Sequence, residues 1–153
     1  MKIKMILSEN NRKPYNEALP SNTTLKKAAE RMCEKGVGAM LVVDPDDSQR
    51  HVGIISERDI LRRCCTDDDF KQTKIESVMS RDLLVAKDDD DVDYVMKIMN
   101  QRNIRHIPIV NNESKIIDLI SIRDILRSTI EADKITIQHL SDFSRGTRRN
   151  DVY

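Results

Sequence analysis

An internal repeat constrains the fold of this chain more than any other feature. Residues 51–63 (HVGIISERDILRR) align without a gap on residues 116–128 (IIDLISIRDILRS), at an offset of 65, and seven of the thirteen positions are identical. The identical pairs are Ile55/Ile120, Ser56/Ser121, Arg58/Arg123, Asp59/Asp124, Ile60/Ile125, Leu61/Leu126 and Arg62/Arg127. A single copy of roughly 60 residues is too small to bury a sheet well. We therefore expect two copies that pack together and share one core.

Both copies show the same order of predicted elements. Apolar side chains three and four positions apart predict a helix over residues 25–33, followed by a strand at 39–43. The equivalent helix and strand of the second copy fall at 92–99 and 106–110. Turn residues then lead to another strand, which ends at a serine that can cap a second helix. A further strand is expected at 83–85, and the fold class is α/β, with sheet packed against sheet.

The boundaries follow from this pattern. The first copy is placed at residues 8–65, a polar linker at 66–74, the second copy at 75–131 and a C-terminal tail at 132–153. The tail is expected to form a short helix with a frayed end, which either helps to dimerise the chain or contacts a partner.

Composition narrows the class of function. The chain has 26 Lys plus Arg and 26 Asp plus Glu, so no overall field draws nucleic acid or an anionic membrane. The N-terminal apolar stretch is too short for a signal peptide, and no segment is long enough to span a membrane. Three cysteines lack metal-ligand spacing and fit reduced thiols in the cytoplasm, with packing as the main role of Cys64 and Cys65 and redox sensing as the alternative.

The repeated motif places Ser, Arg and Asp where a strand runs into a helix. Such a junction presents backbone N–H groups and the positive end of the helix dipole, which favours phosphate. The serines add a hydroxyl donor, the arginines can pair with phosphate oxygens, and the aspartates can accept hydrogen bonds from a ribose diol. Helix capping alone also explains Ser followed three residues later by Asp, although capping does not require Arg.

Residues 14–63 and 81–128 resemble two cystathionine-β-synthase-type (CBS) domains. The resemblance is carried by GVGAMLVVD (36–44) with VGIISERDIL (52–61), and by NIRHIPIVN (103–111) with LISIRDIL (119–126). It implies two β-α-β-β-α repeats related by a pseudo-two-fold axis, with two clefts between the sheets. Such CBS pairs (Bateman modules) bind AMP, ADP or ATP, and some bind S-adenosylmethionine or NAD. They often form homodimers and signal by conformational change to a regulated protein, whose identity here is unknown.

The resemblance also assigns roles to residues. It implies that Asp59 and Asp124 bind ribose, and that Asp118, where the family usually has glycine, adds bulk and negative charge near the phosphates of the second cleft. The segments 14–16 and 80–82 resemble the stretch that lines the opposite repeat's cleft. The nucleotide-binding residues expected on this basis are Asn16, Gly38, Ala39, Ser56, Arg58, Asp59, Ser80, Arg81, Arg105, His106, Ser121, Arg123 and Asp124.

Three functions are consistent with the sequence. The first is an adenine-nucleotide-binding regulatory module with no obligatory cofactor and no metal. The second is an enzyme, against which stands the lack of a Ser-His-Asp order, a metal quartet or a Gly-rich P-loop in the sequence. The third is a structural module whose clefts are degenerate and which acts through dimer contacts.

Overall fold

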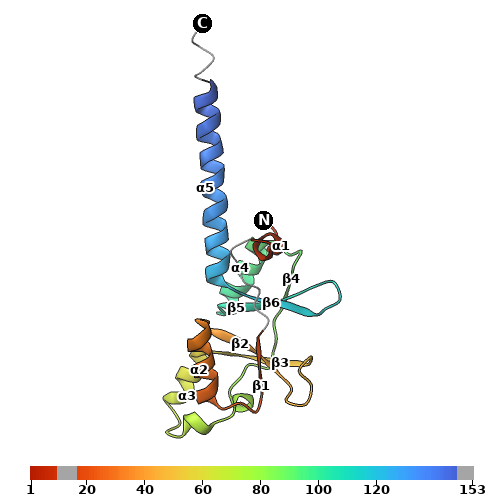
Figure 1. Ribbon diagram of the computed structural model, residues 1–153, viewed down its shortest axis with the longest axis vertical. Helices are drawn as coiled ribbons and strands as arrows, with labels where there is room; N and C mark the ends of the chain where they lie inside the picture. The colour runs from red at the N-terminus through yellow and green to blue at the C-terminus, as the bar shows by residue number, and fades with distance from the viewer. Residues whose placement is uncertain (10–16, 148–153) are drawn as a thin grey trace.

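Two small three-stranded sheets, each with its own helices, make up the computed structural model, which describes residues 1–9 and 17–147 and side chains as far as Phe143 (Figure 1). The first repeat runs β1 (Ala18–Pro20), α2 (Leu25–Lys35), β2 (Ala39–Val43), β3 (His51–Ser56) and α3 (Glu57–Cys64). The second runs β4 (Ala86–Lys87), α4 (Val92–Gln101), β5 (His106–Val110), β6 (Ile116–Ser121) and α5 (Ile122–Thr147). The α/β class and the β-α-β-β-α order of both repeats are confirmed.

The two sheets have the same topology and register. In each, the first strand pairs parallel with the middle strand, and the middle strand pairs antiparallel with the last. Ala39 pairs with Ser56 in the first sheet, and His106 pairs with Ser121 in the second. The start of each middle strand therefore lies beside the Ser that opens the next helix.

The strand expected at residues 83–85 lies three residues further along the chain. The backbone N–H groups of Leu83 and Leu84 donate to Arg81 and Asp82 carbonyls two residues back, so this stretch forms turns. Pairing with β5 begins only at Ala86, opposite Ile109, where the small Ala86 side chain is buried in the core. The position of this strand is set by its pairing with β5. The prediction of a strand at 83–85, which used local residue type alone, is wrong.

Local signals start and stop the helices as expected. The Thr24 side chain accepts a hydrogen bond from the Lys27 backbone N–H and caps α2. Gly36 ends the same helix with φ 64°, a left-handed conformation that glycine adopts without strain. A tight return into β2 follows.

The outer faces of the sheets hold two helix-covered cores, and the inner faces meet in a third. Ala39, Leu41 and Leu119 are buried between the two sheets. Helices α2 and α3 cover the outer face of the first sheet, while α4 and α5 cover that of the second. A core shared by the two repeats is therefore present between the sheets, but it lies beside a separate helix-covered core in each repeat, where one common core was expected.

The packing crosses the boundaries drawn from the repeat. Helix α1 (Ile3–Leu7) buries Ile3 and Ile6 completely in the core of the second repeat. Conversely, Ile75 and Met79, which precede the second repeat's own strands, lie in the core of the first. The segment before the first copy thus packs in the second repeat, and the start of the second copy packs in the first.

Helix α5 is one continuous helix of 26 residues where a short helix and a frayed tail were expected. At 1.5 Å per residue it is about 39 Å long, and beyond its first turns it projects away from both sheets (Figure 1). Within the described residues, no helix combines the length and apolarity that a bilayer crossing needs. The projecting part leaves large apolar side chains exposed, namely Ile130, Ile135, Ile137, Leu140 and Phe143.

Candidate functional site

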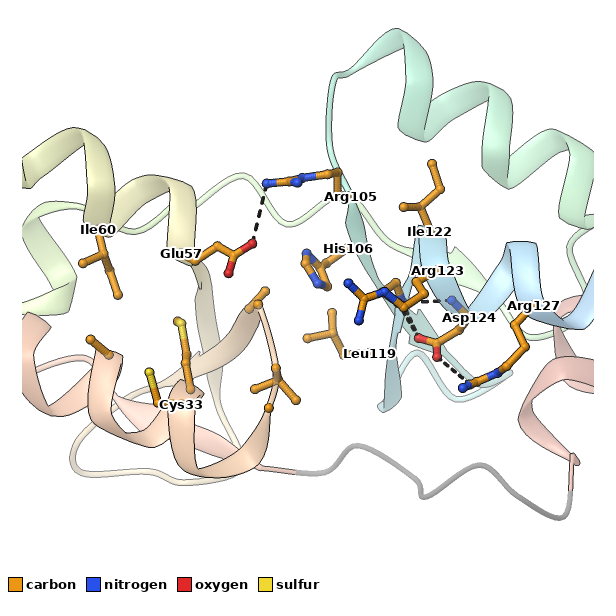
Figure 2. A pocket seen from close by; sticks show the side chains of 17 residues that line it. Cys33, Glu57, Ile60, Arg105, His106, Leu119, Ile122, Arg123, Asp124 and Arg127 are labelled. Atoms are coloured by element: carbon orange, nitrogen blue, oxygen red, sulfur yellow. Dashed lines mark hydrogen bonds and ion pairs between the residues drawn. The ribbon is translucent and has the colours of Figure 1, made fainter.

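Two cavities lie between the repeats, and the same four residues at the starts of β2 and β5 (Gly38, Ala39, Arg105 and His106) line both. One cavity, of about 530 Å³, is closed by the β3–α3 junction and is called the Asp59 cavity below. The other, of about 750 Å³, is closed by the β6–α5 junction and is called the Asp124 cavity (Figure 2).

Each strand–helix junction contains a reciprocal capping box. Asp59 Oδ2 accepts hydrogen bonds from the Ser56 backbone N–H and hydroxyl, both at 2.8 Å, and the Asp59 N–H donates to Ser56 Oγ at 3.3 Å. Asp124 Oδ2 accepts the same two bonds from Ser121 at 2.9 and 2.6 Å. Capping therefore occupies one oxygen of each aspartate and holds the carboxylate at the cavity wall.

The second oxygens of the two aspartates have different surroundings. Asp124 Oδ1 accepts a hydrogen bond from Arg127 Nη2 at 3.0 Å, an ion pair across one helical turn (Figure 2). No described residue donates to Asp59 Oδ1, although Arg62 stands at the equivalent position of α3 and lines the same cavity. The Asp59 carboxylate thus has one oxygen that accepts from no described residue, whereas both oxygens of the Asp124 carboxylate accept hydrogen bonds.

Arginines give the side chains that line each cavity a net positive charge. Arg58 donates a long hydrogen bond of 3.4 Å to the Asn103 carbonyl oxygen and lines the Asp59 cavity, and Arg123 lines the Asp124 cavity. The capping boxes use neither side chain. The Asp59 cavity carries Arg58, Arg62, Arg102 and Arg105 against Asp59 and Asp82, whereas the Asp124 cavity carries Arg105, Arg123 and Arg127 against Glu57 and Asp124.

His106 stands where the two cavities meet. Burial lowers the pKa of His106, and the positive charge of Arg105 lowers it further, while Glu57 and Asp124 act in the opposite direction. A Cβ on Gly38 would lie 3.3 Å from His106 Cε1 and 3.2 Å from Glu57 Oε1. The absence of a side chain at residue 38 therefore lets the imidazole of one repeat approach the backbone of the other.

The segment before β4 reaches the Asp59 cavity, as predicted for residues 80–82. Ser80 lines the cavity and pairs with Ile54 of β3 through two backbone hydrogen bonds of 3.0 Å. Gly53 makes this approach possible, because a Cβ there would lie 2.7 Å from the Ser80 carbonyl oxygen. Arg81 lines neither cavity and donates to the Glu76 carbonyl oxygen at 3.0 Å. Asn16, the counterpart expected for the other cavity, lies outside the described residues.

Asp118 does not lie where the sequence interpretation placed it. It pairs with Ile109, whose side chain faces the helix-covered core, and only 4% of its surface is exposed. Its Oδ1 accepts a hydrogen bond from the Leu119 N–H at 2.7 Å, and Asp118 lines neither cavity. Adjacent strand residues face opposite sides of a sheet, so Leu119 faces the Asp124 cavity and Asp118 does not. The predicted phosphate repulsion by this residue is wrong.

Several residues that line the cavities were absent from the nucleotide-binding residues predicted from the sequence. Arg62 and Arg127 are identical in the aligned repeats and lie one helical turn after each aspartate, a signal that was present in the sequence. Arg102 and Asn103 line the Asp59 cavity without a repeated counterpart to mark them, and Asp82, which belongs to the segment 80–82 predicted to reach this cavity, lines it as well. Among the described residues, no three His, Cys, Asp or Glu side chains are grouped as metal ligands.

A family model described as the CBS domain matches residues 12–65 and 75–131. The chain belongs to the CBS-domain family. An uncharacterized 17.7 kDa protein of Acidianus ambivalens is 30% identical over 126 residues, covering 82% of this chain and 74% of that protein. The chain spans between 20% and 84% of the length of the curated relatives described for it.

Solved structures agree with this CBS-pair fold. A putative signal-transduction protein with CBS domains from Burkholderia ambifaria is 32% identical, with a TM-score of 0.76, covering 86% of this chain and 95% of that one. The CBS-domain protein PAE2072 of Pyrobaculum aerophilum, complexed with AMP, is 27% identical with a TM-score of 0.70, covering 81% and 89%.

Proposed function

We propose that this CBS pair binds adenine nucleotides between its repeats and passes the bound state to another protein as a regulatory signal. One observation carries the proposal: each cavity joins a capped aspartate to an arginine that capping does not need. A ligand with a diol and a phosphate uses both groups at once. The cavity volumes of about 530 and 750 Å³ fall in the range of small-molecule sites.

The geometry suggests how each part of the ligand is held. The ribose diol donates to the aspartate oxygen that the capping box leaves open, and the phosphate pairs with Arg58 or Arg123. The adenine lies against the backbone at the starts of β2 and β5, where Gly38 leaves room. Because both repeats line each cavity, a bound nucleotide contacts both, and its binding free energy can shift their relative placement.

The AMP bound to the Pyrobaculum relative supports this ligand class. The alternative of a structural module draws support from the capping boxes, which give Ser56, Asp59, Ser121 and Asp124 a role without ligand. Capping leaves Arg58 and Arg123 unexplained, so the binding function is favoured. S-adenosylmethionine and NAD present a ribose to the same aspartates and belong in any test.

The proposal includes the assembly and the compartment. The exposed apolar side chains of α5, together with Leu61 on α3, fit a homodimer, because a lone chain leaves them in water. All three cysteines are free, as in a reducing compartment such as the cytoplasm.

Thermal unfolding with a ligand panel tests the proposal. A nucleotide at a hundred times its Kd stabilises the protein by about 2.7 kcal/mol, which raises the Tm of a chain of this size by about 5–10 °C. Adenosine, AMP, ADP, ATP, S-adenosylmethionine and NAD form the panel, with GMP, which has the same ribose and phosphate but another base, as the control for adenine recognition. Equal shifts with GMP and AMP would contradict adenine binding, and no shift with any ligand would leave the structural module as the function.

A further inference from the structure

Each cavity contains an aspartate and an arginine at equivalent positions, and only in the Asp124 cavity do the two form an ion pair. An arginine follows the aspartate by three positions in both helices, as Asp59 with Arg62 and Asp124 with Arg127. Arg127 Nη2 lies 3.0 Å from Asp124 Oδ1, while no described residue forms an ion pair with Asp59. Both arginines line their cavities, so either can reach the space in which a ligand binds.

The ion pair affects the oxygen that a ligand needs. In each aspartate, Oδ2 already accepts two hydrogen bonds from its serine. A ribose diol must therefore rely on Oδ1, and in the Asp124 cavity this atom already accepts from Arg127. A carboxylate oxygen has two lone pairs, so Arg127 competes with the ribose and does not exclude it.

We propose that Arg127 competes with the ribose for Asp124 and makes the Asp124 cavity the weaker of two nucleotide sites. This inference rests on the proposed nucleotide binding and assigns an order to it: the Asp59 cavity fills first. Arg127 is half exposed at 52% and Asp124 is 23% exposed. An ion pair at such a surface changes an equilibrium by about twofold to fivefold, and the expected effect on affinity has that size.

Calorimetric titration with AMP at low salt tests the order of filling. The wild-type protein should show two unequal sites, with Asp59→Ala abolishing the tighter and Asp124→Ala abolishing the weaker. Arg127→Ala should raise the affinity of the weaker site by about twofold to fivefold and leave the tighter unchanged. Arg127→Lys keeps a cation near Asp124 and should give a smaller gain. Arg62→Ala, the matched change in the other helix, should raise neither affinity.

Salt provides a readout that a purely structural role would not change. Because an exposed ion pair is screened, the ratio of weak-site affinities between Arg127→Ala and wild type should approach one near 1 M salt. Two equal wild-type sites, or a loss of affinity in Arg127→Ala, would overturn the role of Arg127 while leaving nucleotide binding intact. Absence of AMP heat in the wild type, Arg127→Ala and Arg62→Ala alike would overturn the proposed function itself.

Discussion

At the scale of one residue, substitution of Arg58 distinguishes a ligand-binding role of the Asp59 cavity from helix capping alone. The side chain lines the Asp59 cavity, and its one hydrogen bond to another described residue is the 3.4 Å bond to the Asn103 carbonyl oxygen. Arg58→Ala should therefore change the free energy of unfolding by no more than about 0.5 kcal/mol. If Arg58 pairs with phosphate, AMP affinity at this site should fall by about tenfold to a hundredfold, and adenosine affinity should change far less.

Calorimetry with AMP and adenosine measures this difference, beside urea unfolding of the same variant. Lys97→Ala is the matched control, because Lys97 is an exposed cation of α4 outside both cavities. Unchanged AMP affinity in Arg58→Ala would remove the phosphate role from this residue and favour the structural module.

At the scale of elements, we expect the short helix α1 to contribute to the stability of the core of the second repeat. Ile6 is fully buried in the second repeat, whereas Met5 of the same helix is 55% exposed. Ile6→Ala should lower the free energy of unfolding by about 2–5 kcal/mol, because it leaves a cavity in a packed core. Met5→Ala should change it by less than about 0.5 kcal/mol. Urea unfolding that gave equal losses for both would contradict this packing.

Repetition explains which elements and site residues the sequence could predict. The strands Ala39–Val43 and His106–Val110 occur where the repeated apolar runs placed them, and the serines and aspartates form the predicted caps. The strand at 83–85 was wrong because its position depends on its partner in the sheet. The length of α5 was underestimated, although no Gly or Pro, the residues that most often end a helix, occurs within residues 122–145.

The ion pair that makes the cavities unequal could not be predicted. Arg62 and Arg127 are identical in the aligned sequences and equally spaced from their aspartates. Their different states depend on where each long side chain lies in the folded molecule, and a sequence pattern does not contain this. Asp118 shows the same limit, because the face of the strand on which it lies decides its role.

At the scale of the whole molecule, an exposed apolar side of α5 predicts self-association. Leu126, Ile130, Ile137 and Leu140 follow one another by four, seven and three residues, which places them along one side of the helix. All four are at least 46% exposed, and a seam with this spacing is typical of paired helices. Ile135 lies on the opposite side of α5, since two residues turn a helix by about 200°.

A second copy of the chain is the partner that these observations favour, because the stripe is then buried against itself. Light scattering at micromolar concentration should give about twice the chain mass of 17.7 kDa. Ile130→Ser combined with Ile137→Ser should shift the mass to the monomer, since two apolar contacts are lost at the centre of the seam. Ile135→Ser is equally polar but off the seam and should remain dimeric. A monomeric wild-type protein, with and without AMP, would contradict the dimer, and loss of the dimer in Ile135→Ser alone would move the interface to the other side of α5.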